Sequence, residues 1–209
     1  MSVKAQSSYH HGDLKQALVK EALTIIAEEG AAGLSLRELA RRVGVTQTAP
    51  YRHFEDRDAL LATVAEEGFR LLKERLEATG DECTIATTNT PNSIRQIGER
   101  YIDFAIKNPS HYRVMFGPFV SNAKRDNKFP GLIKTAEALR SHLISIIEGG
   151  QGLGLFRAGP AAEIADSTWS LVHGLATLII DKHISEDGHG ATTNLALDVW
   201  WRAICKDER

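Results

Sequence analysis

Residues 35–54, SLRELARRVGVTQTAPYRHF, carry the side chains whose types and spacing best suit contact with a nucleic acid. The amide of Gln47 and the hydroxyl of Thr48 can exchange hydrogen bonds with base edges, and the Ala49 methyl can contact a thymine. Groups able to bind phosphate oxygens surround them: Thr46, Tyr51, Arg52, His53 and Arg57. From the spacing alone, DNA binding and a helical hairpin on the protein surface, whose arginines are merely solvated, are equal alternatives.

Two short helices must position these groups, and the start of the first is marked by a capping box. In this motif the Ser35 hydroxyl accepts from the Glu38 amide, and the Glu38 carboxylate reaches back to the Ser35 amide. Leu34 and Leu39 complete a hydrophobic staple around the cap. Gly44 is expected to end this helix about two turns later.

The second short helix is predicted to run from Thr46, as its cap, to Phe54. Pro50 must lie within about the first turn, where a missing amide costs least. Val45 and Tyr51 are available to pack inward. The two helices and the tight turn between them predict a helix-turn-helix, whose second helix can enter a major groove.

Helical periodicity extends over most of the chain, and strand signals are almost absent. Asp13 is expected to cap a helix that ends at Gly30, and Asp56 to cap a helix from Arg57 to Glu77. The polar, Thr-rich residues 78–92 are predicted to form a flexible connection. Further helices are predicted over 93–107, 109–116, 132–147, 160–183 and 192–206, separated by Gly117-Pro118, Pro130-Gly131, 149–154 and 186–190. The predicted fold is all-α, with a three-helix N-terminal domain over 9–60 and a larger helical domain over 61–209.

Composition excludes several classes of protein. The chain is 43% hydrophobic and 25% charged, which suits a globular protein with a sizeable core. The N-terminal residues lack a signal-peptide apolar core, and the longest uncharged apolar stretch, 167–180, is too short for a bilayer. We therefore expect a soluble, cytoplasmic protein without membrane contact. The net charge of −2 argues against a protein that coats nucleic acid, although residues 34–57 hold five arginines and three acids.

Several spaced motifs between residues 9 and 77 resemble the DNA-binding domain of the TetR family of bacterial transcriptional regulators. The matching motifs are AEEG at 27–30, LSLRELA at 34–40, VGV at 43–45, YRHF at 51–54 and RDALL at 57–61. The resemblance implies that residues 46–49 face the groove and that Tyr51 and Arg57 bind phosphate. Pro50 departs from the family pattern, which implies a slightly different recognition helix. The predicted DNA-binding set is Ser35, Thr46, Gln47, Thr48, Ala49, Tyr51, Arg52, His53 and Arg57.

The C-terminal part resembles, more loosely, the TetR subgroup named for a Trp-His-Gly signature, through residues 108–117 and 169–176. This resemblance implies a two-fold dimer, whose last two helices form a four-helix bundle with the partner, and a small-molecule pocket in each C-terminal domain. The helix over 160–183 is apolar almost all round, which independently favours a symmetric partner over the alternative of an interior helix. The predicted interface residues are Leu171, Leu175, Leu178, Ile179, Leu197, Trp200, Trp201 and Ile204.

Aromatic and polar residues of the middle helices are candidates to line the effector pocket. They are Phe69, Tyr101, Phe104, His111, Tyr112, Met115, Phe116, Phe119, His142, Trp169 and His173. Core packing explains each residue separately, whereas together they predict a mostly apolar cavity with one or two hydrogen-bonding groups. An uncharged or weakly polar aromatic or lipophilic effector is therefore expected, because burying an unpaired charge is costly.

An enzyme is the rival class, but the sequence has no glycine-rich phosphate loop, nucleophile elbow or metal-spaced cluster. We therefore expect no catalytic residue, no metal and no cofactor. The two cysteines cannot make a disulfide scaffold, and Cys83 leaves a redox-sensing role open as a minor alternative. The function predicted by these observations is a ligand-responsive repressor that binds a near-palindromic DNA operator as a homodimer.

Overall fold

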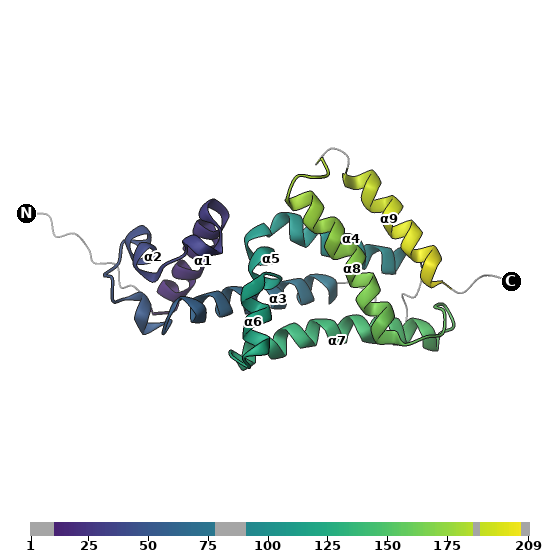
Figure 1. Cartoon of the computed structure of the whole chain (residues 1–209), viewed down its shortest axis with the longest axis horizontal. Coiled ribbons are helices and arrows are strands. Elements are labelled where there is room, and N and C mark those ends of the chain that lie inside the picture. The colour runs from purple at the N-terminus through teal and green to yellow at the C-terminus, as the bar shows by residue number, and fades with distance from the viewer. Residues whose placement is uncertain (1–10, 78–90, 186–188, 206–209) are drawn as a thin grey trace, which may run out of the picture. The chain divides into compact units, whose positions relative to one another are not determined.

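A computed structural model describes residues 11–77, 91–185 and 189–205, and these residues are almost entirely helical (Figure 1). The all-α prediction is confirmed. Outside the helices, the regular pairing in this described part is an isolated antiparallel bridge between Phe156 and Cys205. The α-helices are α1 (His11–Glu29), α2 (Leu36–Val43), α3 (Arg57–Glu77), α4 (Pro91–Lys107), α5 (Pro109–Met115), α6 (Pro118–Arg125), α7 (Pro130–Gly152), α8 (Ala161–Ile180) and α9 (His189–Ile204), with 3-10 helices η1 (Ala31–Gly33) and η2 (Pro50–Arg52).

The chain divides into two compact units, and α3 begins in one and ends in the other. The N-terminal unit comprises the described residues of 1–67 together with 110–132. The C-terminal unit comprises the described residues of 68–109 and 133–209. The predicted ranges 9–60 and 61–209 therefore differ from these units mainly in the placement of α5 and α6, which pack with the N-terminal helices. A hydrogen bond from the Ser110 hydroxyl to the Leu23 carbonyl oxygen (3.0 Å) links α5 to α1.

Within the N-terminal unit, α1, α2 and the first part of α3 enclose a small apolar core. Its fully buried members include Leu18, Ile25, Leu39, Leu60 and Leu61. The Asp56 carboxylate accepts from the Ala59 amide (2.7 Å), which confirms the predicted cap and the predicted bounds of α3. The predicted cap at Asp13 is wrong, because α1 already begins at His11.

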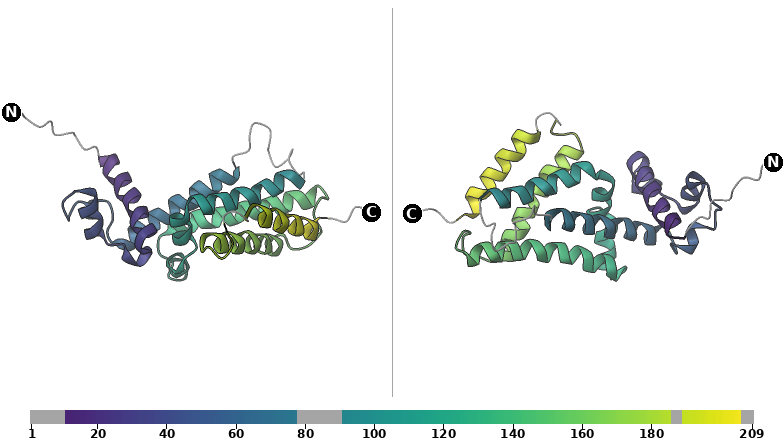
Figure 2. Two further views of the ribbon diagram at one scale, coloured as in Figure 1. Left: turned by 90° about the horizontal axis from the view of Figure 1, so that it is seen from above. Right: turned by 180° about the vertical axis from the view of Figure 1, so that it is seen from behind.

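Within the C-terminal unit, α4, α8 and α9 lie side by side (Figure 2). The predicted helix over 160–183 is α8, which Pro160 precedes as its N-cap residue, and α9 begins earlier than the predicted Thr192. Residues 78–90 of the predicted connection, with Cys83, lie outside the described residues, and α4 already begins at Pro91.

Three predicted breaks lie at the start of a helix or within one. Gly117 is the N-cap residue of α6 and Pro118 is its first residue, so this dipeptide starts a helix that the sequence analysis missed. Pro130 likewise starts α7, which continues through Gly149 and Gly150 to Gly152. A Cβ atom at Gly150 would lie 2.1 Å from the Phe156 ring, so the glycine leaves space for this buried side chain inside the helix. Close packing against Phe156 therefore accounts for Gly150, and the end of α7 at Gly152 falls within the same glycine run.

Candidate nucleic-acid interface

The first helix of the predicted helix-turn-helix has the expected boundaries. The Ser35 hydroxyl accepts from the Glu38 amide (3.2 Å) at the start of α2. Gly44 ends the helix in the left-handed conformation (φ 76°), which favours glycine because it lacks a Cβ atom. Leu34 and Leu39, which flank the cap in sequence, are both buried, as the predicted staple requires.

The second helix is shorter than predicted. In place of a regular helix from Thr46 to Phe54, the structure has turns that lead into the 3-10 helix η2. The Thr46 carbonyl accepts from the Ala49 amide (2.9 Å), three residues on. A regular helix would use the amide of residue 50, which a proline lacks, so Pro50 prevents this bond and occupies the first position of η2. Pro50, the departure from the family pattern, therefore stands at the start of η2, and no regular helix runs from Thr46 to Phe54.

The segment 46–53 nevertheless presents its polar groups to solvent. Thr46, Gln47, Thr48, Tyr51 and Arg52 are all exposed, while Ala49 and His53 are half-buried. The hydroxyl oxygens of Thr46 and Thr48 lie 3.3 Å apart, within hydrogen-bonding distance. Tyr51 was predicted to be available for inward packing, but half of it is exposed. Buried Pro50 and Phe54 instead fix the segment to the core of the unit.

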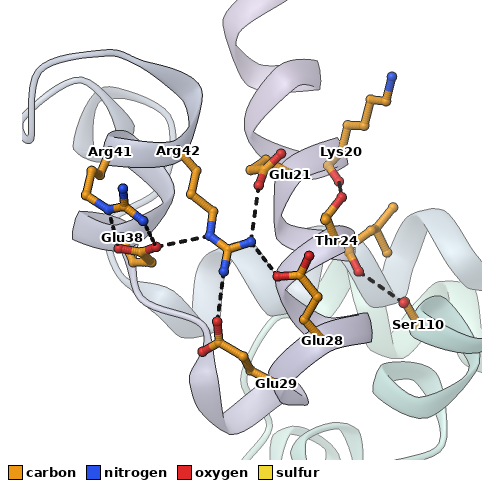
Figure 3. A network of polar contacts seen from close by, with 10 residues as sticks. Lys20, Glu21, Thr24, Glu28, Glu29, Glu38, Arg41, Arg42 and Ser110 are labelled. Atoms are coloured by element: carbon orange, nitrogen blue, oxygen red, sulfur yellow. Dashed lines mark hydrogen bonds and ion pairs between the residues drawn. The ribbon is translucent and has the colours of Figure 1, made fainter.

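A guanidinium group on α2 joins this helix to α1 (Figure 3). Arg42 pairs with Glu28 (Nη1–Oε2 2.6 Å), Glu29 (Nη2–Oε1 2.8 Å) and Glu38 (Nε–Oε1 3.0 Å), and Glu21 lies at 3.7 Å. Arg41 makes a two-bond contact with the Glu38 carboxylate (2.6 and 2.8 Å). Glu38 therefore pairs with both arginines, and the predicted bond from its carboxylate back to the Ser35 amide is replaced by these ion pairs.

The same contacts shift the titration of the groups involved. Hydrogen bonds from Arg41 and Arg42 lower the pKa of the Glu38 carboxyl to about 2. Hydrogen bonds to Glu28 and Glu38 raise the pKa of Arg42 above its usual value. These side chains are consequently charged at neutral pH. Three of the five arginines between residues 34 and 57, namely Arg41, Arg42 and Arg57, are paired with carboxylates within the unit.

Arg57, a predicted phosphate contact, is also engaged within the fold. Its Nη2 donates to the Ala31 carbonyl oxygen (2.6 Å), and its Nη1 lies 3.4 Å from Asp58 Oδ1. Its Nε is buried without a hydrogen-bond partner. The side chain therefore links the start of α3 to η1.

The C-terminal unit brings three of the predicted effector-site residues together. The Trp169 indole nitrogen donates to the Tyr101 hydroxyl oxygen (3.0 Å), which lies 3.1 Å from His173 Nδ1. The Trp169 and His173 ring centroids are 5.4 Å apart. Burial lowers the pKa of His173 and so favours the neutral imidazole, whose Nδ1 can accept from the tyrosine hydroxyl. This row of groups connects α4 with α8.

The other predicted effector residues are divided between the units. Phe69 and Phe104 are buried in the C-terminal unit, where His142 is half-buried and its Nδ1 lies 3.9 Å from Glu77. The members on α5 and the start of α6 belong to the N-terminal unit: His111, Tyr112, Met115, Phe116 and Phe119. His111 is buried, and its Nε2 has no hydrogen-bond partner. Burial lowers the pKa of His111, against an opposing effect of Glu67.

The predicted interface residues occupy different depths in the protomer. Leu175, Ile179 and Leu197 are buried in its own core, and Leu171, Trp200, Trp201 and Ile204 are half-buried. Trp200 donates to the Thr168 hydroxyl (2.9 Å), and Trp201 packs edge-on against Phe156. Leu178 is exposed, as are Leu195 and Val199, which the sequence analysis missed. Their spacing of four residues on α9 places both on one helix face and is the sequence signal for them.

Among the described residues, no group of three or more His, Cys, Asp and Glu side chains could hold a metal ion. Among the helices covered by this description, none combines the length and the apolar character needed to cross a membrane.

The comparisons with known proteins agree with this geometry. Residues 18–64 match the family described as "Bacterial regulatory proteins, tetR family", and residues 94–199, half of the chain, match "Tetracyclin repressor-like, C-terminal domain". The HTH-type transcriptional regulator Rv1816 of Mycobacterium tuberculosis is 30% identical over 92 residues. That match spans 44% of this chain and 38% of the relative, so the chain covers well under half of that protein's length.

Solved structures match over nearly the whole chain. A protein of unknown function from Rhodococcus sp. RHA1 is 28% identical with a TM-score of 0.80, and the match covers 96% of this chain and 100% of that one. A putative TetR family regulator from Shewanella sp. PV-4 has the same fold at 18% identity (TM-score 0.70; 92% and 98% covered). The fold and the two family matches thus define a bacterial regulatory protein with an N-terminal helix-turn-helix domain. The chain belongs to the TetR family of bacterial regulatory proteins.

Proposed function

We propose that the chain is a ligand-responsive repressor that binds a near-palindromic operator as a homodimer in the bacterial cytoplasm. The observation that carries the proposal is the exposure of the polar side chains of residues 46–48, 51 and 52 on a segment that the buried Pro50 and Phe54 attach to the core. Gln47 and Thr48 would read base edges, and Tyr51 and Arg52 would bind phosphates. In a two-fold dimer the two copies of this run would enter major grooves about 34–36 Å apart.

The test begins with an operator selected from a random duplex pool by the wild-type protein. Gln47→Ala should change discrimination at one base pair by about 1–3 kcal/mol, because it removes a hydrogen-bonding group from a base edge. Tyr51→Phe should weaken binding to operator and random duplex alike, because a phosphate contact carries no sequence information. If both variants keep the wild-type affinity and preference, the groove assignment is wrong.

The homodimer is supported by the apolar side chains that α8 and α9 leave in solvent. Leu178 is 44% exposed, Leu195 66% and Val199 60%. A second copy of α8 and α9 related by a two-fold axis would cover all three.

We also propose that the C-terminal part belongs to the subgroup with the Trp-His-Gly signature, and the contact between Trp169 and His173 supports this.

The interface is tested by placing a charge on this face. Leu178→Glu or Leu195→Glu should yield monomers in sedimentation, because the symmetry would bury two unpaired carboxylates in one interface. Leu153→Glu is the matched control, since Leu153 is 57% exposed but lies beyond the end of α7. The monomeric variants should also lose operator affinity, because one half-site supplies too few contacts. Dimers in both interface variants would contradict the proposal.

The proposed effector is an uncharged or weakly polar aromatic or lipophilic molecule. Buried Phe69, Tyr101 and Phe104 supply an apolar environment in the C-terminal unit, and His173 supplies a polar group. Such surroundings would make the burial of a charged ligand costly. The ligand would favour a conformation with the wrong spacing of the two recognition segments, residues 46–53 of each protomer. It can shift this equilibrium by no more than its difference in affinity for the two states.

A thermal-shift screen of small molecules, followed by operator release, tests the effector class. Molecules that raise the unfolding temperature and release operator should be neutral and largely apolar. Exclusively charged ligands, such as phosphorylated metabolites or metal ions, would contradict the apolar site. Neutral ligands that stabilise the protein without altering operator affinity would contradict the regulatory role.

A further inference from the structure

The basic residues around the helix-turn-helix fall into two groups according to their partners. Arg41, Arg42 and Arg57 have partners within the N-terminal unit: the first two pair with carboxylates, and the third contacts both a carbonyl oxygen and the Asp58 carboxylate. Arg52, on the recognition segment, is exposed, and no carboxylate in the described part of the chain pairs with it. The number of arginines in the segment therefore overstates the charge available to a phosphate backbone.

Lys15 on α1 belongs to the second group, although it lies outside the helix-turn-helix. Its side chain is exposed, and its Nζ lies 5.9 Å from the centroid of the Phe54 ring, as in a cation–π contact. Phe54 is the buried residue that follows the recognition segment, and its amide donates to the Pro50 carbonyl oxygen (2.9 Å). The contact therefore holds an ammonium group of α1 beside the end of that segment.

The geometry of α1 separates this ammonium group from the acidic residues of the same helix. At about 100° per residue, Glu21 and Glu28 share one face of α1, and Lys15 lies about 120° away from them. Glu21 and Glu28 face Arg42 of α2, whereas Lys15 faces Phe54 (Figure 3 shows the acidic face). No described carboxylate lies within ion-pair distance of Lys15. The positive charge is thus available on the side that carries the recognition segment.

We propose that Lys15 is a phosphate contact contributed by α1 beside the recognition segment. Lys15 makes no ion pair with a carboxylate of the described residues, so a phosphate would displace no such partner from its ammonium group. An ammonium group is a point charge that binds phosphate without a fixed orientation, which suits a contact at the edge of an interface.

The salt dependence of binding to a random-sequence duplex tests this inference, which rests on the proposed groove contact of residues 46–53. Each phosphate contact contributes about 0.9 to the slope of log affinity against log salt concentration. Lys15→Met keeps the alkyl chain over Phe54 and removes the charge, so the slope should fall by about 0.9 per bound protomer. Lys20→Met is the matched control, since Lys20 is exposed on the same helix but lies about 140° around it.

One further variant separates the possible failures. Arg52→Met should lower the slope as Lys15→Met does. A normal slope in Lys15→Met together with a reduced slope in Arg52→Met overturns the inference alone. Normal slopes in both overturn the groove contact itself.

Discussion

In the N-terminal unit, the guanidinium group of Arg42 and four carboxylates join α1 to α2. In the C-terminal unit, by contrast, side chains pack closely against the helices at glycines. A Cβ atom at Gly98 of α4 would lie 2.6 Å from the Leu197 side chain of α9, and one at Gly150 would overlap Phe156. Charged contacts near a surface are screened by salt and depend on pH, while close packing depends on volume. The two units should therefore respond to different perturbations.

The largest expected effect is the loss of the Phe156 ring. Phe156 is buried against Ile147 and Ala165 and packs edge-on with Trp201. Phe156→Ala should lower the free energy of unfolding by about 3–5 kcal/mol, because it removes buried apolar surface and leaves a cavity. Denaturant unfolding measures this loss, which should be almost independent of salt concentration. A strong salt dependence would contradict the distinction between the units.

Adding a methyl group at the same contact should have a smaller effect. Gly150→Ala should cost about 1–3 kcal/mol, since the ring must move to admit the Cβ atom. In a Phe156→Ala background the same change should cost little, because the obstructing ring is absent. Gly152→Ala is the control, since a Cβ atom there meets nothing within 4 Å. Equal costs for Gly150→Ala in the two backgrounds would place the conflict elsewhere.

The row of hydrogen bonds between α4 and α8 should be of similar importance. Tyr101→Phe removes the hydroxyl that accepts from Trp169 and contacts His173 Nδ1. We expect a loss of about 1–3 kcal/mol in denaturant unfolding, the usual cost when part-buried polar groups lose a partner. A change in tryptophan fluorescence should accompany it, because the environment of the indole changes. Unchanged stability would mean that the groups find other partners at no cost.

In the N-terminal unit, Arg42→Met should lower the unfolding temperature and make it sensitive to salt. Removing the guanidinium leaves Glu21, Glu28, Glu29 and Glu38 close together without their shared cation. Arg41→Met is the control, because Arg41 pairs with Glu38 alone and is largely exposed. The difference between the variants should be largest in dilute buffer and should mostly disappear in concentrated salt. A difference that salt does not reduce would indicate lost packing.

The smallest expected effect is a change in acid stability at Glu38. Because its pKa falls from 4.5 to about 2 on folding, its stabilising contribution is complete above about pH 4.5 and is lost as the pH falls toward 2. Between these values the unfolding temperature of the wild type should fall more steeply than that of Glu38→Gln. Parallel curves would show that the carboxylate is not stabilised by its arginines.

The features that the sequence predicted correctly depend on residues that lie close together in the sequence. The caps at Ser35 and Asp56 each require one side chain and one amide three residues later, so local sequence is sufficient. The Glu38 carboxylate was assigned to the wrong partner, because Arg42 is held in place by acids of α1 that lie far away in sequence. The glycines of α7 predict a break in the sequence, because Phe156 follows the helix and only the fold brings its ring back onto Gly150. Proline chemistry explains the short recognition segment, since residue 50 cannot supply the amide that a longer helix needs.

The turns between Thr46 and Ala49 have a consequence for how operator preference can diverge among descendants of this protein. Substitution in a regular helix is penalised for β-branched and small polar residues by up to about 0.7 kcal/mol each. Residues 46–48 lie before η2, exposed and outside any regular helix, so such penalties do not apply to their side chains. Their identities can therefore be exchanged with little loss of folding stability, while Pro50 and Phe54 keep the backbone in place. Selection for a new operator can then act on these positions almost independently of selection for a stable fold.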